Sequence, residues 1–127
     1  MISWEITLEA ELTWKWYDEV VGAGSSPQMA FLKKITKNYE TISRKAGYHR
    51  EFVMCDMVAM AALLKPELIA ESRHLHGAVE LSGSYTRGAT VFDWLGHSSH
   101  APNTHVVMKM NRIEYGNYVA SVYNKNR

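Results

Sequence analysis

The sequence has few of the features that mark secreted and membrane proteins. Its 127 residues include one cysteine, Cys55, and no Asn-X-Ser or Asn-X-Thr triplet. One cysteine cannot form an internal disulfide, and secreted proteins commonly carry such glycosylation acceptors. No stretch approaches the roughly 20 apolar residues of a membrane span, and residues 1–5 have no basic or apolar region of signal-peptide length. We expect a cytoplasmic protein with no membrane partner.

The sequence also lacks an excess of charge of either sign. Lysine and arginine together number 14 against 13 for aspartate and glutamate, which gives a formal net charge of +1. So balanced a chain has no long-range field to attract nucleic acid or an anionic membrane, and neutral or small partners fit it better. With 46% hydrophobic and 21% charged residues the chain is apolar enough to fold, and its length suits one unit over residues 1–127.

The amino-terminal segment predicts a strand and then a helix. Ile2–Leu8 alternates weakly between apolar and polar residues, which is typical of a strand. Leu12, Trp16 and Val20 recur at helical spacing, and Gly22–Pro27 follows them. The two glycines of this stretch superficially resemble a phosphate-binding loop, but such a loop follows a strand rather than a helix. We therefore predict a plain helix-to-helix connector.

Two further helices are predicted before residue 68. The first is a surface helix with an apolar stripe toward the core at Phe31, Ile35, Tyr39 and Ile42, and a basic outer face at Lys33, Lys34, Lys37 and Arg44. The second is the nearly unbroken apolar run Met57–Leu64, which predicts a fully buried helix. Asp56 at its start and Pro66 beyond its end are typical boundary residues.

The remaining residues predict short strands and a closing helix. The expected strands are Ala78–Leu81, Ser84–Thr86, Ala89–Trp94 and His105–Met110, with a loop at 96–103 and a helix from Arg112 to about Tyr123. Helices mixed with strands favour an α/β fold.

Two groups of residues could carry chemistry but have simpler interpretations. The histidines at 74, 76, 97, 100 and 105 could suggest a metal cluster, yet they lie in a polar loop or alternate along a strand, so we expect exposed histidines. The four tryptophans could form a base-stacking platform, but no basic groove accompanies them, so packing in the core or an interface is the better interpretation. Taken alone, Cys55 and Asp56 also fit a small apolar residue and a helix cap.

A more specific pattern comes from three longer segments. In residues 52–68 an Asp opens an apolar helix that ends in a Pro-containing turn, and residues 79–94 form a strand segment with a Thr-Arg-Gly turn. Pro102-Asn103 and Val106–Met108 follow in order. Over roughly residues 48–120 this pattern resembles the carboxy-terminal portion of the inosine-uridine-preferring nucleoside hydrolases, and Ser3–Glu5 adds a weaker likeness to their Pro-Trp-Glu element. The resemblance implies the carboxy-terminal part of an open mixed-sheet, Rossmann-like α/β fold.

The resemblance also implies a chemistry. Members of this family hydrolyse the N-glycosidic bond of ribonucleosides with the help of a bound calcium ion. Asp56 falls at the position of a calcium-ligand aspartate, and Cys55 falls where many members carry a histidine that assists departure of the base, as in a subgroup with cysteine there. Developing negative charge on the leaving base and positive charge on the ribose explain the need for a proton donor and carboxylates. A ribonucleoside substrate and a homo-oligomer are the expected partners.

The departures from the family pattern are equally informative. No Asp-X-Asp followed by an Asp-Asp pair occurs in the sequence, and the family's ribose-binding Asn and Glu segment is missing. We therefore expect residues 1–127 to be a carboxy-terminal fragment of one nucleoside hydrolase domain, inactive alone. The alternative is a non-enzymatic, truncated paralogue that binds another protein or its own copy.

Overall fold

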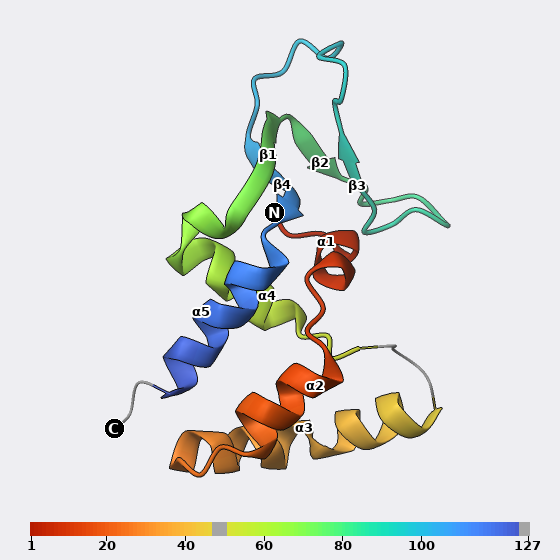
Figure 1. The fold of residues 1–127 in the computed structure, drawn as a ribbon. Helices are drawn as coiled ribbons and strands as arrows, with labels where there is room; N and C mark the ends of the chain where they lie inside the picture. Colours follow the sequence, from red (N-terminus) through yellow and green to blue (C-terminus); the bar gives the residue numbers. More distant parts are fainter. Residues whose placement is uncertain (47–50, 125–127) are drawn as a thin grey trace.

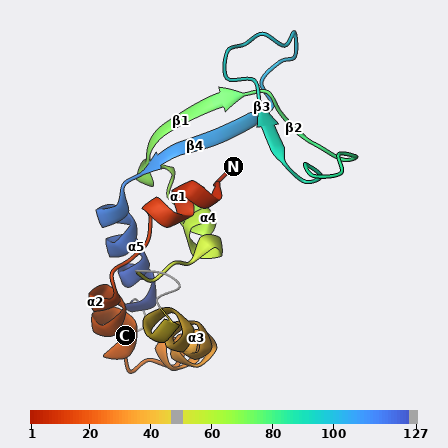
Figure 2. The same cartoon turned by 90° about the vertical axis from the view of Figure 1, so that its right-hand side faces the viewer.

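The computed structural model describes residues 1–46 and 51–124, so residues 48–50 of the family resemblance lie outside it. Helices and strands occupy opposite ends of an elongated molecule (Figure 1). The short helix α2 and the long helix α3 lie together at one end, α4 and α5 cross in the middle, and the strands form the other end (Figures 1 and 2). None of the helices in the described residues is long and apolar enough to cross a bilayer.

The strand expected at Ile2–Leu8 is wrong, because helix α1 spans Trp4–Glu9. Ser3 caps this helix, since its hydroxyl accepts a hydrogen bond from the N–H of Ile6 at 3.4 Å. Ile6 and Thr7 point inward while Glu5 stays exposed, so the alternation that resembled a strand is the inner and outer face of one helical turn and a half.

The next helix begins later than the apolar spacing predicts. Leu12 forms an isolated antiparallel bridge with Phe52, and Thr13 then caps helix α2, Trp14–Tyr17, which continues as the π-helix η1, Asp18–Gly22. Helix α3, Pro27–Ala46, follows. The prediction of a helix-to-helix connector at Gly22–Pro27 is confirmed.

Helix α3 is a surface helix as expected, but its predicted inner stripe is wrong. Phe31, Ile35 and Ile42 are exposed, and Tyr39 is half-buried. The helix instead buries the neighbouring stripe of Met29, Leu32, Thr36 and Ser43. The polar Thr36 tolerates this position because its hydroxyl donates to Leu32 O at 2.7 Å and lies 2.8 Å from Tyr17 Oη.

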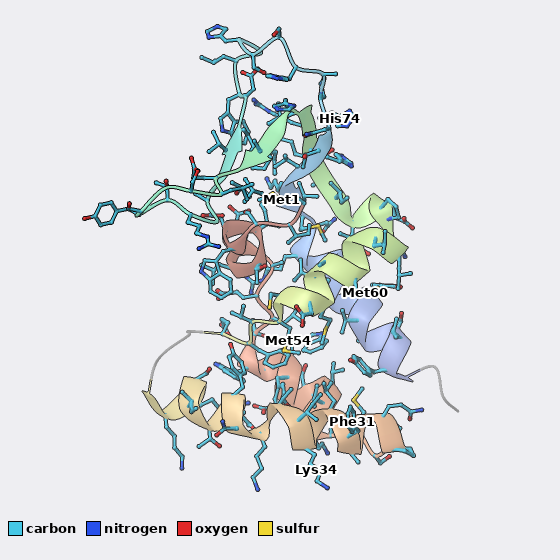
Figure 3. The ribbon with its side chains drawn as sticks, turned by 180° about the vertical axis from the view of Figure 1, so that it is seen from behind. Met1, Phe31, Lys34, Met54, Met60 and His74 are labelled. Carbon is cyan, nitrogen blue, oxygen red and sulfur yellow. The ribbon has the colours of Figure 1, made fainter. Side chains whose placement is uncertain are left out.

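Helix α4, Cys55–Leu64, matches the predicted apolar helix in position but is not fully buried. Val58, Ala61 and Ala62 face the core, whereas Met60, Leu63 and Leu64 are 54–72% exposed. The side chain of Met60 points outward from α4 (Figure 3). The apolar run thus has one face covered by this chain and one face uncovered. Pro66 begins the short 3₁₀ helix η2, Pro66–Leu68.

The strands form two antiparallel pairs. Strand β1, Ile69–Leu75, pairs with β4, Thr104–Met110, and β2, Gly77–Val79, pairs with β3, Thr90–Phe92. The strand expected at Ser84–Thr86 is wrong, because residues 84–88 form a turn between β2 and β3 that ends at Gly88 with a φ of +88°. Strand β4 and the closing helix α5, Arg112–Asn124, confirm the predictions for this region.

The core has an aromatic centre on Phe52. Its ring centroid lies 4.8 Å from that of Tyr17, 5.8 Å from Trp14 and 5.9 Å from Tyr39. Trp14 and Trp16 therefore serve packing, as predicted, whereas Trp4 and Trp94 are exposed. The arrangement is a mixed α/β fold, in agreement with the sequence.

Candidate functional site

Cys55 and Asp56 lie in the first turn of α4. Met54 occupies the N-cap position and makes no side-chain cap bond, so the helix-cap interpretation of Asp56 is wrong. Both side chains are exposed, and the Cys55 thiol lies 3.6 Å from Asp56 Oδ1. A carboxylate in a helix's first turn interacts favourably with the helix dipole, and here it remains accessible to a ligand.

These two residues are among those that line a groove of about 340 Å³. Three parts of the chain form it: α1 through Trp4, α3, and the start of α4 with the segment leading into it. The lining residues are Trp4, Ile35, Thr36, Tyr39, Val53, Met54, Cys55 and Asp56. The groove therefore combines aromatic and aliphatic walls with one carboxylate and one thiol, which suits a ligand with a flat apolar part and a polar part.

Hydrogen bonds hold the groove walls together. The N–H of Val53 donates to Tyr39 Oη at 3.1 Å, and Leu12 and Phe52 exchange two backbone bonds of 2.9 and 2.8 Å. Tyr17 reinforces α3 through Thr36, and burial raises the pKa of Tyr17. The start of α4 is thereby fixed against α3, so Cys55 and Asp56 have a defined position relative to the aromatic wall.

The residues that the structure describes do not form a complete metal site. Calcium takes about 6–8 oxygen ligands. Within residues 1–46 and 51–124 no group of three or more His, Cys, Asp or Glu side chains could hold a metal ion. Asp56 can supply at most its two carboxylate oxygens, and a thiol is a poor calcium ligand. Asp56 thus fits one ligand position and no more.

The histidines lie elsewhere. His74 is at the strand end of the molecule, whereas Met54, just before Cys55, lies between α4 and the helical end (Figure 3). The rings of His76 and His100 are stacked with centroids 4.6 Å apart, and His76 Nδ1 lies 3.1 Å from Ala101 O. His74, His97, His100 and His105 are exposed, as predicted, and His76 is half-buried.

Known proteins resemble this chain over most of its length. The model of a family described as inosine-uridine preferring nucleoside hydrolase matches residues 1–116. The chain belongs to that family. Among solved structures, a protein titled Inosine-Guanosine Nucleoside Hydrolase superposes on this nucleoside hydrolase chain with a TM-score of 0.82 and 27% sequence identity. The match covers 94% of this chain but 37% of the other, so the chain spans little more than a third of that relative's length. No curated protein sequence gives a significant match.

Sequence reasoning assigned only Cys55 and Asp56 to the site, and Trp4 is one of the groove residues that it missed. The likeness of Ser3–Glu5 to a family element was the available signal, but α1 and α4 are separated by about 50 residues of sequence, and only the fold brings them to one groove. The family match extends to residue 1, which includes this segment in the nucleoside hydrolase pattern.

Proposed function

We propose that this chain supplies the carboxy-terminal part of a nucleoside hydrolase active site, and that the complete enzyme cleaves the N-glycosidic bond of ribonucleosides to base and ribose. The observation that carries the proposal is the groove in which Asp56 and Cys55 adjoin Trp4 and Tyr39. The family match and the solved inosine-guanosine nucleoside hydrolase support it. With one carboxylate at the groove, the chain alone is inactive.

Each groove residue has a proposed task. Asp56 would supply an oxygen ligand to a calcium ion, and other parts of the complete enzyme would supply the remaining ligands. When bound, such a cation makes its water easier to deprotonate and holds ribose oxygens. Cys55 lies beside the departing base and assists it weakly, because a thiol is a weaker hydrogen-bond donor and proton shuttle than imidazole.

A chimera tests the proposal. The chain replaces the matching segment of the inosine-guanosine nucleoside hydrolase, and inosine hydrolysis is measured together with calcium affinity. We expect turnover from the chimera and none from the chain alone. Asp56→Ala should weaken calcium binding and remove most turnover, because charge and geometry are lost together.

The matched control is Glu67→Ala, which removes an exposed carboxylate that forms a surface ion pair with Lys65. It should leave both readouts unchanged. A well-folded chimera that hydrolyses no nucleoside would overturn the proposed function, and unchanged calcium affinity and turnover in Asp56→Ala would overturn the role of Asp56. Folding is checked by a cooperative thermal transition.

Cys55 is tested in the same chimera with two substrates. Cys55→Ser should lower turnover of inosine modestly, and Cys55→His should raise it where the leaving base needs a proton. An activated nitrophenyl riboside needs little such help and should respond less. Loss in Cys55→Ser as large as in Asp56→Ala on both substrates would contradict the leaving-group role.

A second candidate function is a self-associating, non-enzymatic module. The observation that favours it is the uncovered apolar face of α4, at Met60, Leu63 and Leu64. An inactive chimera, together with dimers of the isolated chain that Leu63→Ser dissociates in light scattering, would support this function over catalysis.

A further inference from the structure

Two pairs of histidine rings lie on β1, β4 and the loops that adjoin them. His74 of β1, at the strand end of the molecule (Figure 3), is directly opposite His105 of β4 in the antiparallel register. Their ring centroids are 6.4 Å apart, with an angle of 74° between the ring planes. In the second pair, the centroids of His76 and His100 are 4.6 Å apart and the angle is 19°. Because imidazole nitrogen is a preferred ligand of zinc, copper and nickel, each pair could hold a metal ion.

The separation of His74 and His105 allows one ion to lie between the two rings. Zinc binds about 2.0–2.1 Å from an imidazole nitrogen, which itself lies roughly 1.2 Å from its ring centre, so two ligating rings have centroids at most about 6.5 Å apart. The observed 6.4 Å lies within this limit. Both side chains are exposed, so each is free to rotate about its torsions, and a tetrahedral arrangement needs a centroid separation of about 5 Å. The strands thus hold two imidazoles within reach of one metal ion.

The pair of His76 and His100 lacks this property. The lone pair of an imidazole nitrogen lies in the plane of the ring, so two nearly parallel stacked rings direct their lone pairs along parallel planes that do not converge on one ion. His76 is also half-buried, and its Nδ1 lies 3.1 Å from Ala101 O, which engages that nitrogen in a hydrogen bond. The stacked pair therefore serves packing of the loop before β4, and it provides a matched control for the opposed pair.

We propose that His74 and His105 form a binding site for a divalent transition metal ion of the zinc, copper and nickel class, which ties β1 to β4. Two imidazoles on neighbouring strands bind an ion more tightly than one exposed histidine, because the second ligand binds intramolecularly. The described residues offer no group of three His, Cys, Asp or Glu ligands, so water completes the coordination. Calcium prefers oxygen ligands and is not expected here. The proposal goes beyond the proposed nucleoside hydrolysis and does not depend on it.

Calorimetric titration of the chain with Zn²⁺ tests the proposal. Every sample carries Cys55→Ser, because the exposed thiol is itself a good zinc ligand. We expect His74→Ala and His105→Ala each to weaken zinc binding by about tenfold or more, since either change leaves a single imidazole. The double variant should be scarcely weaker than either single variant, because the first change already breaks the chelate. His76→Ala, from the stacked pair, and His97→Ala, an exposed histidine of the loop, are the controls and should keep the affinity.

Proton NMR of the same chain with all its histidines present gives a second measurement that needs no histidine variant. Of the six histidines, the imidazole resonances of His74 and His105 should shift first and together as Zn²⁺ is added, while those of His76 and His100 stay in place. Hydrogen exchange of the amides of β1 and β4 should also slow, because the ion joins the two strands. Equal losses of affinity in His74→Ala and His97→Ala overturn the proposal. Independent, additive losses in His74→Ala and His105→Ala, or a first shift at His76, overturn it as well.

Discussion

The aromatic centre around Phe52 and the β2–β3 hairpin differ in how fully this chain covers them. Phe52 is 1% exposed and contacts rings from α2 and α3. In the hairpin, Val79 and Val91 are exposed, and the two strands pair over three residues each. A two-stranded pair is marginal without further packing. The comparison separates a region that the chain completes alone from one whose apolar side chains still lack a covering layer.

The largest expected effect comes from emptying the aromatic centre. Phe52→Ala should lower the free energy of unfolding by about 3–5 kcal/mol, because the ring leaves a cavity among tightly packed neighbours. Phe92→Ala, in the half-covered hairpin, should cost less than half as much. Urea denaturation of both variants checks this, and equal losses would show that the hairpin is as well packed as the centre.

A smaller and local effect is expected at Gly77 in β2. A Cβ at this position would lie 2.6 Å from Cε1 of Phe92, so Gly77→Ala should cost about 1–3 kcal/mol by overpacking. The loss should appear as faster hydrogen exchange in β2 and β3, while the amides of α3 and α4 keep their protection. Gly22→Ala is the control, because its nearest neighbour would lie at an ordinary 3.7 Å. Global unfolding of Gly77→Ala would mean that the hairpin and the helical end form one cooperative unit.

The smallest effect on stability is expected when the pH is lowered, and it should be confined to the loop after β3. The pKa of Asp93 is lowered to about 2 by hydrogen bonds from Ser98 and then from the N–H of His97. A carboxyl whose folded-state pKa lies below its unfolded value of about 3.9 stabilises the loop above that value and loses this effect as pH falls toward 2. The amide resonances of His97 and Ser98 should therefore shift with a midpoint near 2. Asp93→Asn should abolish that titration, and a midpoint near 4 would contradict the hydrogen-bonded loop.

The sequence predicted the elements whose ends carry local signals. Gly22–Pro27 separates two helices, and β4 and α5 lie where apolar alternation and spacing placed them. The errors arose where tertiary contacts choose between two possible faces. In α3 both Phe31–Ile35–Ile42 and Met29–Leu32–Thr36 recur at helical spacing, and the contact with Tyr17 selects the second set. Spacing alone cannot show which stripe another element covers.

The candidate site could likewise be predicted only where it depends on neighbouring residues in the sequence. Cys55 and Asp56 are adjacent in sequence and belong to a recognisable segment, so one local pattern predicted both. Trp4, Ile35 and Tyr39 reach the same groove from other elements, through the Leu12–Phe52 bridge and the bond between Val53 and Tyr39. Such contacts between distant segments produce no periodic pattern in the sequence.

The Leu12–Phe52 bridge bears on how the residues that line this groove can differ between related proteins. The chain departs after Leu12 and returns at Phe52, where the two residues are joined by a pair of main-chain hydrogen bonds that any side chains allow. The segment between these two residues is a closed loop, and doubling the length of a closed loop raises the entropic free-energy cost of closing it by only about 0.6 kcal/mol. Of the residues that line the groove, Ile35, Thr36 and Tyr39 belong to this segment, whereas Cys55 and Asp56 follow it. Exchange of this segment between relatives would therefore change the α3 wall of the groove while Cys55 and Asp56 keep their positions.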